Sequence, residues 1–414
     1  MALKSDAILI FEDKYIKKRL KTNRLLFIWL ILSLLSVNVS AQERKAAAPI
    51  PAAHLTYKYV DYLKNKRVAL LVNQSSTIGS KHLVDSLLSL GINIKKIFCP
   101  EHGFRGNMDA GAKVESTIDS ATKLPLISLY GNNKKPSAKD LTDIDVVVFD
   151  VQDVGVRFYT YLSSLHYMME ACAENKVRLI VLDRPNPNGY YIDGPVMKKE
   201  HYSFVGLHPV PIVYGMTIGE YAQMINGEGW LNTKNKCYLK VIRLAAYTHE
   251  SNYTLPVKPS PNLTDNDAIT LYPSLCLFEG TSISVGRGTY MPFKIIGHPS
   301  LSEKYTFSFT PQAIDGMSKT PPYLNQTCYG IDLTNYVNDS TQQAKQLTIA
   351  WLIEMYQNYP EKDKFFNSFF EKLAGTSELR NQIIEGKSEA EIRKTWQNDL
   401  TTFKEVRKKY LLYK

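Results

Sequence analysis

The sequence lacks the short motifs that most readily identify an α/β enzyme. It contains no GxGxxG after its first apolar run, no GxxxxGKS/T, no HExxH and no GxSxG. These absences remove the best support for nucleotide binding, for a zinc peptidase and for a serine hydrolase. Gly286–Thr289 has only two glycines and follows no clear strand, so it is a weak candidate for a phosphate-binding loop.

Cysteine is scarce as well. The five cysteines are widely spaced, odd in number and form no CxxC pair. This pattern argues against a disulfide framework, although it leaves room for a single bridge in an oxidising compartment. Cys99 and Cys172 lie in apolar patterns, which favours small buried side chains over reactive thiols.

The N-terminal segment has the pattern of an export signal. Lys17–Arg24 is basic, Leu25–Leu35 is apolar, and Val39–Ala41 offers small residues for cleavage. We therefore expect residues 1–41 to be a signal peptide and the protein to be periplasmic or secreted, with no membrane association after cleavage. An uncleaved membrane anchor is the alternative, but the apolar run is shorter than the ~20 residues of a spanning helix, and no later segment resembles one.

The net charge of +10 has little functional meaning once this segment is removed. Residues 1–41 carry seven basic and three acidic side chains, so the remainder holds about +6. That charge is too small and too dispersed to indicate nucleic-acid binding. The next residues, 42–56, contain an Ala- and Pro-rich stretch and are predicted to be a linker.

Continuous apolar runs alternate with helical patterns over the first half of the mature chain. We predict strands at Arg67–Asn73, Ile94–Phe98, Leu124–Tyr130, Ile144–Phe149 and Arg178–Leu182. Amphipathic spacing predicts helices at Lys81–Leu90 and Tyr159–Asn175, and Thr217 with Glu220 forms a capping box for a third. This order is typical of a doubly wound, mainly parallel α/β sheet.

The second half has a different pattern. A strand at Tyr238–Leu244 and a Pro-rich crossing at Leu255–Leu263 are followed by loops at Tyr272–Pro292 and short strands near Tyr305–Phe309 and Tyr329–Leu333. Helices are expected from about residue 342. We therefore predict a first, α/β domain at 57–258 and a smaller α+β domain at 259–414, with a cleft between them.

Polar residues gather where the predicted strands end. The first strand ends at Asn73, and the second is followed by Glu101, His102 and Arg105 in a Gly-containing loop. The carboxyl ends of parallel strands form one edge, where open α/β sheets bind ligands. Partial desolvation at the end of an apolar strand suits Glu101 to donate a proton near neutral pH. A salt-bridged or capping glutamate is the alternative, and His102 either orients the carboxylate, binds substrate or is structural.

The loops that follow the predicted strands Ile144–Phe149 and Arg178–Leu182 continue this edge. Rigid turns that present amide, acid and guanidinium groups suit a ligand with many hydroxyls, because each hydroxyl needs a partner. Internal Asp–Arg pairing and core packing of the tyrosines are the alternatives. The candidate residues of these loops are Asp150, Gln152, Asp153, Arg157, Tyr159, Asp183, Arg184, Asn186 and Asn188.

In the second half, two polar loops are candidates to close the cleft. Glu279 is a candidate second carboxylate and Arg287 a candidate clamp for an acidic substrate, each against a simple loop-bracing role.

Five motifs, in this order, resemble one known family, the exo-β-N-acetylmuramidases of the NamZ type. They are Glu101–Gly106, Phe149–Tyr161, Leu182–Gly189, Ser260–Leu263 and Phe278–Thr281, and the similarity runs from about residue 57 to the C-terminus. The resemblance implies a Rossmann-like domain and a smaller auxiliary domain. It also implies an enzyme that removes terminal N-acetylmuramic acid from the non-reducing end of peptidoglycan fragments such as MurNAc-GlcNAc. The glutamate matching Glu101 is then the general acid or base.

Glycoside hydrolysis needs a second group opposite the proton donor. Asp153, Asp183 and Glu279 are candidates, and the substrate's own acetamido group is another route. The lactyl carboxylate of muramic acid predicts that Arg105, Arg157, Arg184 or Arg287 faces the pocket. No step requires a metal or an organic cofactor. The alternative hypothesis is a non-catalytic cell-wall sugar-binding protein that keeps the cleft without the chemistry.

Overall fold

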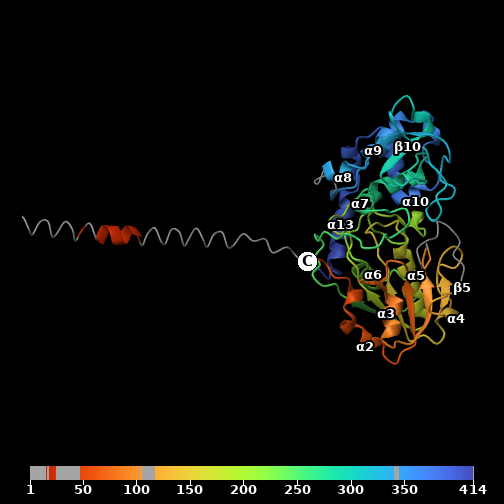
Figure 1. Ribbon diagram of the computed structural model, residues 1–414. Helices are drawn as coiled ribbons and strands as arrows, with labels where there is room; N and C mark the ends of the chain where they lie inside the picture. The colour runs from red at the N-terminus through yellow and green to blue at the C-terminus, as the bar shows by residue number, and fades with distance from the viewer. Residues whose placement is uncertain are drawn as a thin grey trace, which may run out of the picture. The chain divides into compact units, whose positions relative to one another are not determined.

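A seven-stranded sheet organises residues 48–414 (Figure 1). The computed structural model describes residues 15, 18–24, 47–101, 103–104, 117–339 and 345–413. Residues 1–47 form a separate unit, in which residues 18–24 are helical. None of the described helices is long and apolar enough to cross a bilayer.

The strand order is that of a Rossmann-like fold. The sheet runs β5-β6-β4-β1-β7-β8-β9, in which β5 is antiparallel and the other six strands are parallel. Counting the parallel strands along the chain gives the order 3-2-1-4-5-6, whose direction reverses between β1 and β7. The strands are β1 (Val68–Val72), β4 (Ile94–Cys99), β5 (Thr117–Ile118), β6 (Pro125–Ser128), β7 (Val146–Asp150), β8 (Arg178–Leu182) and β9 (Tyr238–Ile242).

Helices cover both faces of this sheet, which explains why β1 and β7 are buried along their whole length. Val68, Leu70 and Val72 pack in one core with α2 (Val60–Leu63) and α3 (Leu83–Ser89). Ala69 and Leu71, which point to the other face, pack in a second core with α5 (Tyr161–Glu174) and α6 (Ile218–Gly227). The alternation of a strand's side chains thus supplies two cores from one apolar run.

The second part is smaller and of α+β type. Its three-stranded antiparallel sheet has the order β10-β12-β11, with β10 at Ile295–His298, β11 at Phe307–Phe309 and β12 at Cys328–Asp332. Its helices are α7 (Asn266–Leu275), α8 (Tyr336–Asp339), α9 (Ala350–Asn358), α10 (Phe370–Ala374), α11 (Glu378–Ile384), α12 (Glu389–Thr395) and α13 (Gln397–Lys408). The short helix α4 (Ala138–Leu141), the hairpin β2 (Thr77–Ile78) and β3 (Lys81–His82), and the 3-10 turn η4 (Cys276–Gly280) complete the elements used below.

Most elements of the first part match the sequence-based prediction. The five predicted strands and the strand near Tyr238 are present, and the Thr217–Glu220 capping box opens α6 as expected. The predicted helix at Lys81–Leu90 begins later, because Lys81 and His82 pair with β2. All five cysteines are free and buried, so the structure contains no disulfide.

The second part was predicted less well. β10 was missed, and α7 occupies a stretch of which Tyr272–Leu275 had been predicted as loop. Pro273 lies inside α7 and cannot donate to the Ile269 carbonyl one turn earlier. The Asn188 side chain donates to that carbonyl instead, at 3.2 Å. A residue 81 positions away therefore supplies the hydrogen bond that the helix lacks.

Candidate active site

A cavity of about 600 Å³ lies at the carboxyl edge of the sheet and is lined by both parts of residues 48–414. The ends of β4 and β6 and the start of α5 form one side, and α7, η4, the loop after it and α10 form the other. This volume falls within the range of small-ligand pockets. The residues that line the cavity are Glu101, Tyr130, Gly131, Asn132, Lys134, Phe158, Tyr159, Thr160, Tyr161, Phe204, Val205, Ser260, Asn262, Leu263, Tyr272, Cys276, Glu279, Arg287, Phe293, Phe369 and Leu373.

Glu101 lies in this cavity at the turn that follows β4. The Gly103 amide donates to the Pro100 carbonyl at 3.0 Å, which closes the turn around the glutamate. Thr160 is the N-cap of α5, but its hydroxyl makes no capping hydrogen bond to the helix. The hydroxyl instead donates a hydrogen bond to Glu101 Oε2 at 2.6 Å. The Tyr130 hydroxyl lies beside this carboxyl, and burial together with the Glu101 charge raises the pKa of Tyr130. The Thr160 hydroxyl and the N-terminus of α5 therefore stabilise negative charge on Glu101, next to the Tyr130 hydroxyl.

The inner end of the cavity is walled by buried aromatic rings. Tyr159 and Tyr272 meet edge to face at 6.0 Å between ring centroids, and Tyr272 meets Phe293 in the same way at 4.9 Å. Arg287 lies over the Phe293 ring at 5.1 Å, and its Nε donates to Glu279 Oε1 at 2.6 Å. The terminal nitrogens of Arg287 make no hydrogen bond to the described residues. Of the four arginines predicted to face the pocket, Arg287 is the one that lines it among those the structure describes.

The outer end of the cavity is more exposed. Gly131 and Asn132 are exposed, whereas Tyr130, Lys134 and Phe204 are half-buried. The Tyr130 and Phe204 ring centroids are 6.2 Å apart, and Lys134 Nζ lies 4.7 Å from the Phe204 centroid. Glu101 thus lies between a buried aromatic end and a half-exposed end.

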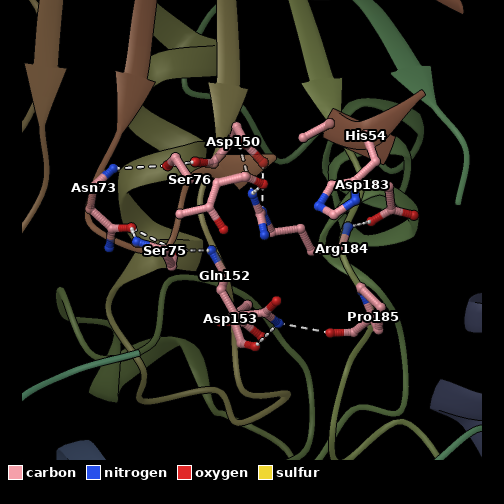
Figure 2. Close-up of polar contacts among 12 residues, drawn as sticks. His54, Asn73, Ser75, Ser76, Asp150, Gln152, Asp153, Asp183, Arg184 and Pro185 are labelled. Atoms are coloured by element: carbon pink, nitrogen blue, oxygen red, sulfur yellow. Dashed lines mark hydrogen bonds and ion pairs between the residues drawn. The ribbon is translucent and has the colours of Figure 1, made fainter. Parts of the chain in front are cut away.

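Several predicted site residues lie at the same edge of the sheet but form a buried network outside the cavity lining (Figure 2). Arg184 forms a two-point ion pair with Asp150, with Nε to Oδ1 at 2.6 Å and Nη2 to Oδ2 at 2.8 Å, and both side chains are buried. Ser76 donates to the Asp150 carbonyl. This is the internal Asp–Arg pairing that the sequence left open as the alternative.

Asn73 reaches the cavity through another residue. Its Nδ2 donates to the Tyr161 hydroxyl at 2.9 Å, and Tyr161 lines the cavity. Its Oδ1 accepts bonds from the amide and the hydroxyl of Ser75 at 3.0 and 2.6 Å. Asn73 therefore fixes the position of a wall tyrosine.

Asp153 is buried outside the cavity lining, next to the wall tyrosines. Its Oδ2 accepts hydrogen bonds from the Gly155 amide at 2.7 Å and from the Tyr214 hydroxyl. Its Oδ1 is buried and has no hydrogen-bond partner among the described residues. Burial raises the pKa of Asp153 to about 6. A pKa of about 6 would suit proton exchange near neutral pH. However, Tyr159 and Tyr161 line the cavity and Asp153 does not.

The turn from Asp183 to Asn188 uses its polar groups internally. Asn186 donates to the Met216 carbonyl at 2.8 Å, and Gln152 donates to the Pro185 carbonyl at 2.7 Å. Gly155 has a φ of +77°, and a Cβ there would lie 2.1 Å from Asn186 Oδ1, so only glycine fits. These residues lock the loops after β7 and β8 together, and none of them lines the cavity.

Asp183 and Arg157 are also buried and bonded to protein groups. Asp183 accepts from Thr217 Oγ1, the Gly219 amide and the Tyr413 hydroxyl at 2.6–2.8 Å. Burial is the main cause that raises its pKa to about 7. Arg157 donates to the carbonyls of four residues, which are Pro195, Val210, Leu373 and Ala374. The structure therefore gives Arg157 the role of holding α10 against the loop before α5.

His102 and Arg105 lie outside the described residues. The cavity also contains residues that the sequence analysis had not chosen, above all Tyr130, Thr160, Lys134 and Tyr272. Tyr130 and Thr160 could have been chosen from their positions after strands. Tyr130 ends the predicted third strand, and Thr160 follows the loop after β7. Among the described residues, no group of three or more His, Cys, Asp or Glu side chains is arranged to hold a metal ion.

Comparisons with known proteins agree with this geometry. The family models for the N-terminal and C-terminal parts of the exo-β-N-acetylmuramidase NamZ match residues 68–267 and 270–413. The chain is 37% identical over 396 residues to the peptidoglycan β-N-acetylmuramidase NamZ of Bacillus subtilis strain 168, covering 91% of this chain and 94% of that protein.

Two solved structures from Bacteroides fragilis NCTC 9343 are also similar, both described as DUF1343 family proteins. One is 46% identical with a TM-score of 0.83, over 89% of this chain and 99% of that one. The other is 27% identical with a TM-score of 0.73, over 88% and 99%. The boundary between the two family models falls close to the predicted domain boundary at 258/259, which stays a prediction.

Proposed function

Because this chain belongs to the exo-β-N-acetylmuramidase NamZ family, we propose that it releases terminal N-acetylmuramic acid from the non-reducing end of peptidoglycan fragments, with Glu101 protonating the glycosidic oxygen. It is a glycosidase, as its relative from Bacillus subtilis is. No observation favours the non-catalytic sugar-binding alternative.

The observation that carries the proposal is the environment of Glu101. A carboxyl that gives up its proton to a leaving oxygen becomes negatively charged. The Thr160 hydroxyl and the N-terminus of α5 stabilise that charge, so they favour the state reached after proton transfer. The same groups fix the direction of the carboxyl within the cavity.

The shape of the cavity supports exo action. The buried aromatic end beyond Glu101 suits one terminal sugar ring, and the half-exposed end suits the rest of the chain. Arg287 supports recognition of muramic acid, because its terminal nitrogens can bind the lactyl carboxylate side-on while Glu279 holds Nε. Since Glu279 is already ion-paired, we assign it to positioning Arg287.

The experiment that tests the proposal compares the intact protein with Glu101→Gln. Release of N-acetylmuramic acid from MurNAc-GlcNAc is measured, together with binding of the same disaccharide. We expect turnover to fall by at least 100-fold in Glu101→Gln, with binding and melting temperature retained. Glu303→Gln removes an exposed carboxylate outside the cavity and serves as the matched control.

Two results would contradict the proposal in different ways. Full turnover by Glu101→Gln would remove Glu101 from proton transfer. Binding of the disaccharide without any product from the unaltered protein would instead support the sugar-binding alternative.

Export is a further part of the proposal. The basic and apolar segments within residues 1–41 support cleavage near Ala41 and a periplasmic or secreted location, where peptidoglycan fragments occur. Fractionation of cells that express the full chain, with sequencing of the mature N-terminus, tests it. A product that keeps residues 1–41 in the cytoplasm would contradict this part alone.

A further inference from the structure

Two positively charged side chains line the cavity, and only one of them forms an ion pair with a described residue. Arg287, at the inner end, is paired with Glu279 at 2.6 Å. Lys134, at the outer end, forms no ion pair with any described residue, although it lines the same cavity. An unpaired, half-buried ammonium group in a ligand cavity is a site for an anion.

Contacts around Lys134 hold the ammonium at the cavity instead of leaving it free in solvent. Its Nζ lies over the Phe204 ring, and the Phe204 carbonyl accepts a hydrogen bond from Ser163 Oγ on α5 at 2.6 Å. The Phe204 ring also stacks on Tyr167, with an interplanar angle of 13°. A cation above a ring that is itself fixed to a helix is pre-positioned for a ligand.

The neighbouring lysine shows the contrast. Lys135 bonds Glu170 and Glu174 at 2.6 and 2.7 Å, so its charge is already neutralised, and it does not line the cavity. Two adjacent lysines therefore differ in role: Lys135 holds the loop after β6 to α5, whereas Lys134 faces the cavity.

The side chains between Glu101 and Lys134 indicate which part of a bound substrate lies at Lys134. Glu101 contacts Tyr130, Tyr130 lies 6.2 Å from Phe204, and Phe204 lies 4.7 Å from Lys134. Lys134 is thus two side chains away from the proton donor, in the half-exposed part of the cavity beside Gly131 and Asn132. The first leaving sugar, N-acetylglucosamine, is uncharged, but the muramyl unit after it carries an acid.

We propose that Lys134, held over Phe204, binds a carboxylate on the leaving chain, either the lactyl group of the second muramyl unit or an acid of the peptide attached to it. This inference rests on the proposed function and adds a specificity site to it. Longer fragments are then better substrates than the disaccharide, and the advantage weakens as salt screens the contact.

The test compares Lys134→Gln with the unaltered protein on four substrates. These are a muramic acid glycoside with an uncharged nitrophenyl leaving group, MurNAc-GlcNAc, the peptide-free tetrasaccharide, and the tetrasaccharide that carries peptide. We expect KM for one or both tetrasaccharides to rise about tenfold, the effect of one contact of ~1.4 kcal/mol, with the two smaller substrates unchanged. The tetrasaccharide that responds identifies the source of the carboxylate.

Matched variants separate charge from folding. Lys134→Arg keeps the charge and is expected to retain the preference for long fragments. Lys139→Gln removes an exposed charge on α4 outside the cavity and is expected to change nothing.

The proposal is overturned if Lys134→Gln affects all four substrates equally, which would assign Lys134 to the terminal sugar, or if it affects none. An equal loss on the disaccharide and the tetrasaccharides would also overturn it, because the contact would then be to the uncharged sugar. Failure of the unaltered protein to cleave any of the four would instead refute the proposed function.

Discussion

At the scale of single residues, the site separates side chains that line the cavity from side chains that hold them. Glu101 and Arg287 line it, whereas Asn73 lies outside the lining and fixes the position of Tyr161. Glu279 does both, because it lines the cavity and holds Arg287. Composition alone cannot make this distinction, because both kinds of side chain are polar.

Arg287→Ala tests recognition of the acidic sugar. Removing the guanidinium leaves the lactyl carboxylate without its partner, so we expect kcat/KM on a nitrophenyl muramic acid glycoside to fall by roughly 10- to 100-fold, or ~1.4–2.7 kcal/mol. Activity on the matching N-acetylglucosamine glycoside, which has no lactyl group, should change little. An equal loss on both glycosides would mean that Arg287 only supports the wall of the cavity.

Asp183 makes stability depend on pH. Its pKa in the folded protein is about 7, raised mainly by burial from an ordinary value of 3.8. Between these two pH values the folded state holds a proton that the unfolded chain has lost, so stability falls as pH rises from about 4 to about 7. Asp153, with a pKa raised to about 6, acts in the same direction.

We therefore expect the unaltered protein to unfold at a lower temperature at pH 8 than at pH 5, and Asp183→Asn to reduce that difference. Each unit of pKa shift corresponds to roughly 1.4 kcal/mol. Asp145, whose pKa is lowered to about 2 by hydrogen bonds from Arg67, titrates below this window. An unchanged pH profile in Asp183→Asn would show that Asp183 is ionised throughout.

At the scale of elements, α7 depends on a side chain from the other part of the protein. Asn188 donates to the Ile269 carbonyl that Pro273 leaves unbonded. Asn188→Ala should therefore cost about 1–3 kcal/mol of unfolding free energy, the usual penalty for an orphaned buried carbonyl.

A double-mutant cycle isolates this contact. Pro273→Ala restores an amide that can donate to Ile269, so Asn188→Ala should cost less in that background than in the unaltered protein. Denaturant unfolding of the four proteins gives the coupling energy. Additive costs would show that Asn188 stabilises the fold through its bond to the Val154 carbonyl instead.

This contact also explains what the sequence could not predict. Strands β1, β7 and β8 are almost continuous apolar runs, and β4 ends in the apolar residues Ile97–Cys99, so the apolar pattern was enough to find them and to bring Glu101 to the sheet edge. Nothing local predicts that the amides of Asn186 and Asn188 would be used to brace neighbouring backbone. Their partners, Met216 and Ile269, are 30 and 81 residues away.

The same limit applies to the cavity itself. Asp150, Asp183 and Arg184 were chosen for their position after strands, and that position was right, yet their partners are other buried groups. Lys134 and Tyr272 were not chosen, because a lysine in a turn and a tyrosine in an apolar stretch resemble ordinary surface and core residues. Their place in the cavity depends on how two distant parts of the chain meet.

At the scale of the whole molecule, the two parts of residues 48–414 are joined at several places besides the connecting chain. Arg157 donates to the Leu373 and Ala374 carbonyls of α10, and Arg407 of α13 donates to the Gly215 carbonyl. Beyond α13, the amides of Leu412 and Tyr413 donate to Glu220 Oε1. The last helix of the second part thus returns to the first, and Figure 1 shows α13 beside α6.

Ending the chain at residue 408 should therefore destabilise the first part rather than the second. Asp183 would lose the Tyr413 hydroxyl, and Glu220 would lose the amides of Leu412 and Tyr413. The unfolding free energy should fall by about 1–3 kcal/mol for each buried group left without its partner. Thermal unfolding monitored separately by hydrogen exchange at α6 and at α9 measures this. Lost protection confined to α9 would contradict the expectation.

The contacts of Leu412 and Tyr413 with the first part also predict how the protein responds to a cut between its two parts. A single protease cut engineered into residues 255–257, before the residues of this segment that line the cavity, would divide the polypeptide into two pieces. The pieces should stay together, because the second piece carries Tyr413, whose hydroxyl donates to Asp183. The nicked pair should co-elute as one particle and keep its catalytic power, and it should come apart only in denaturant.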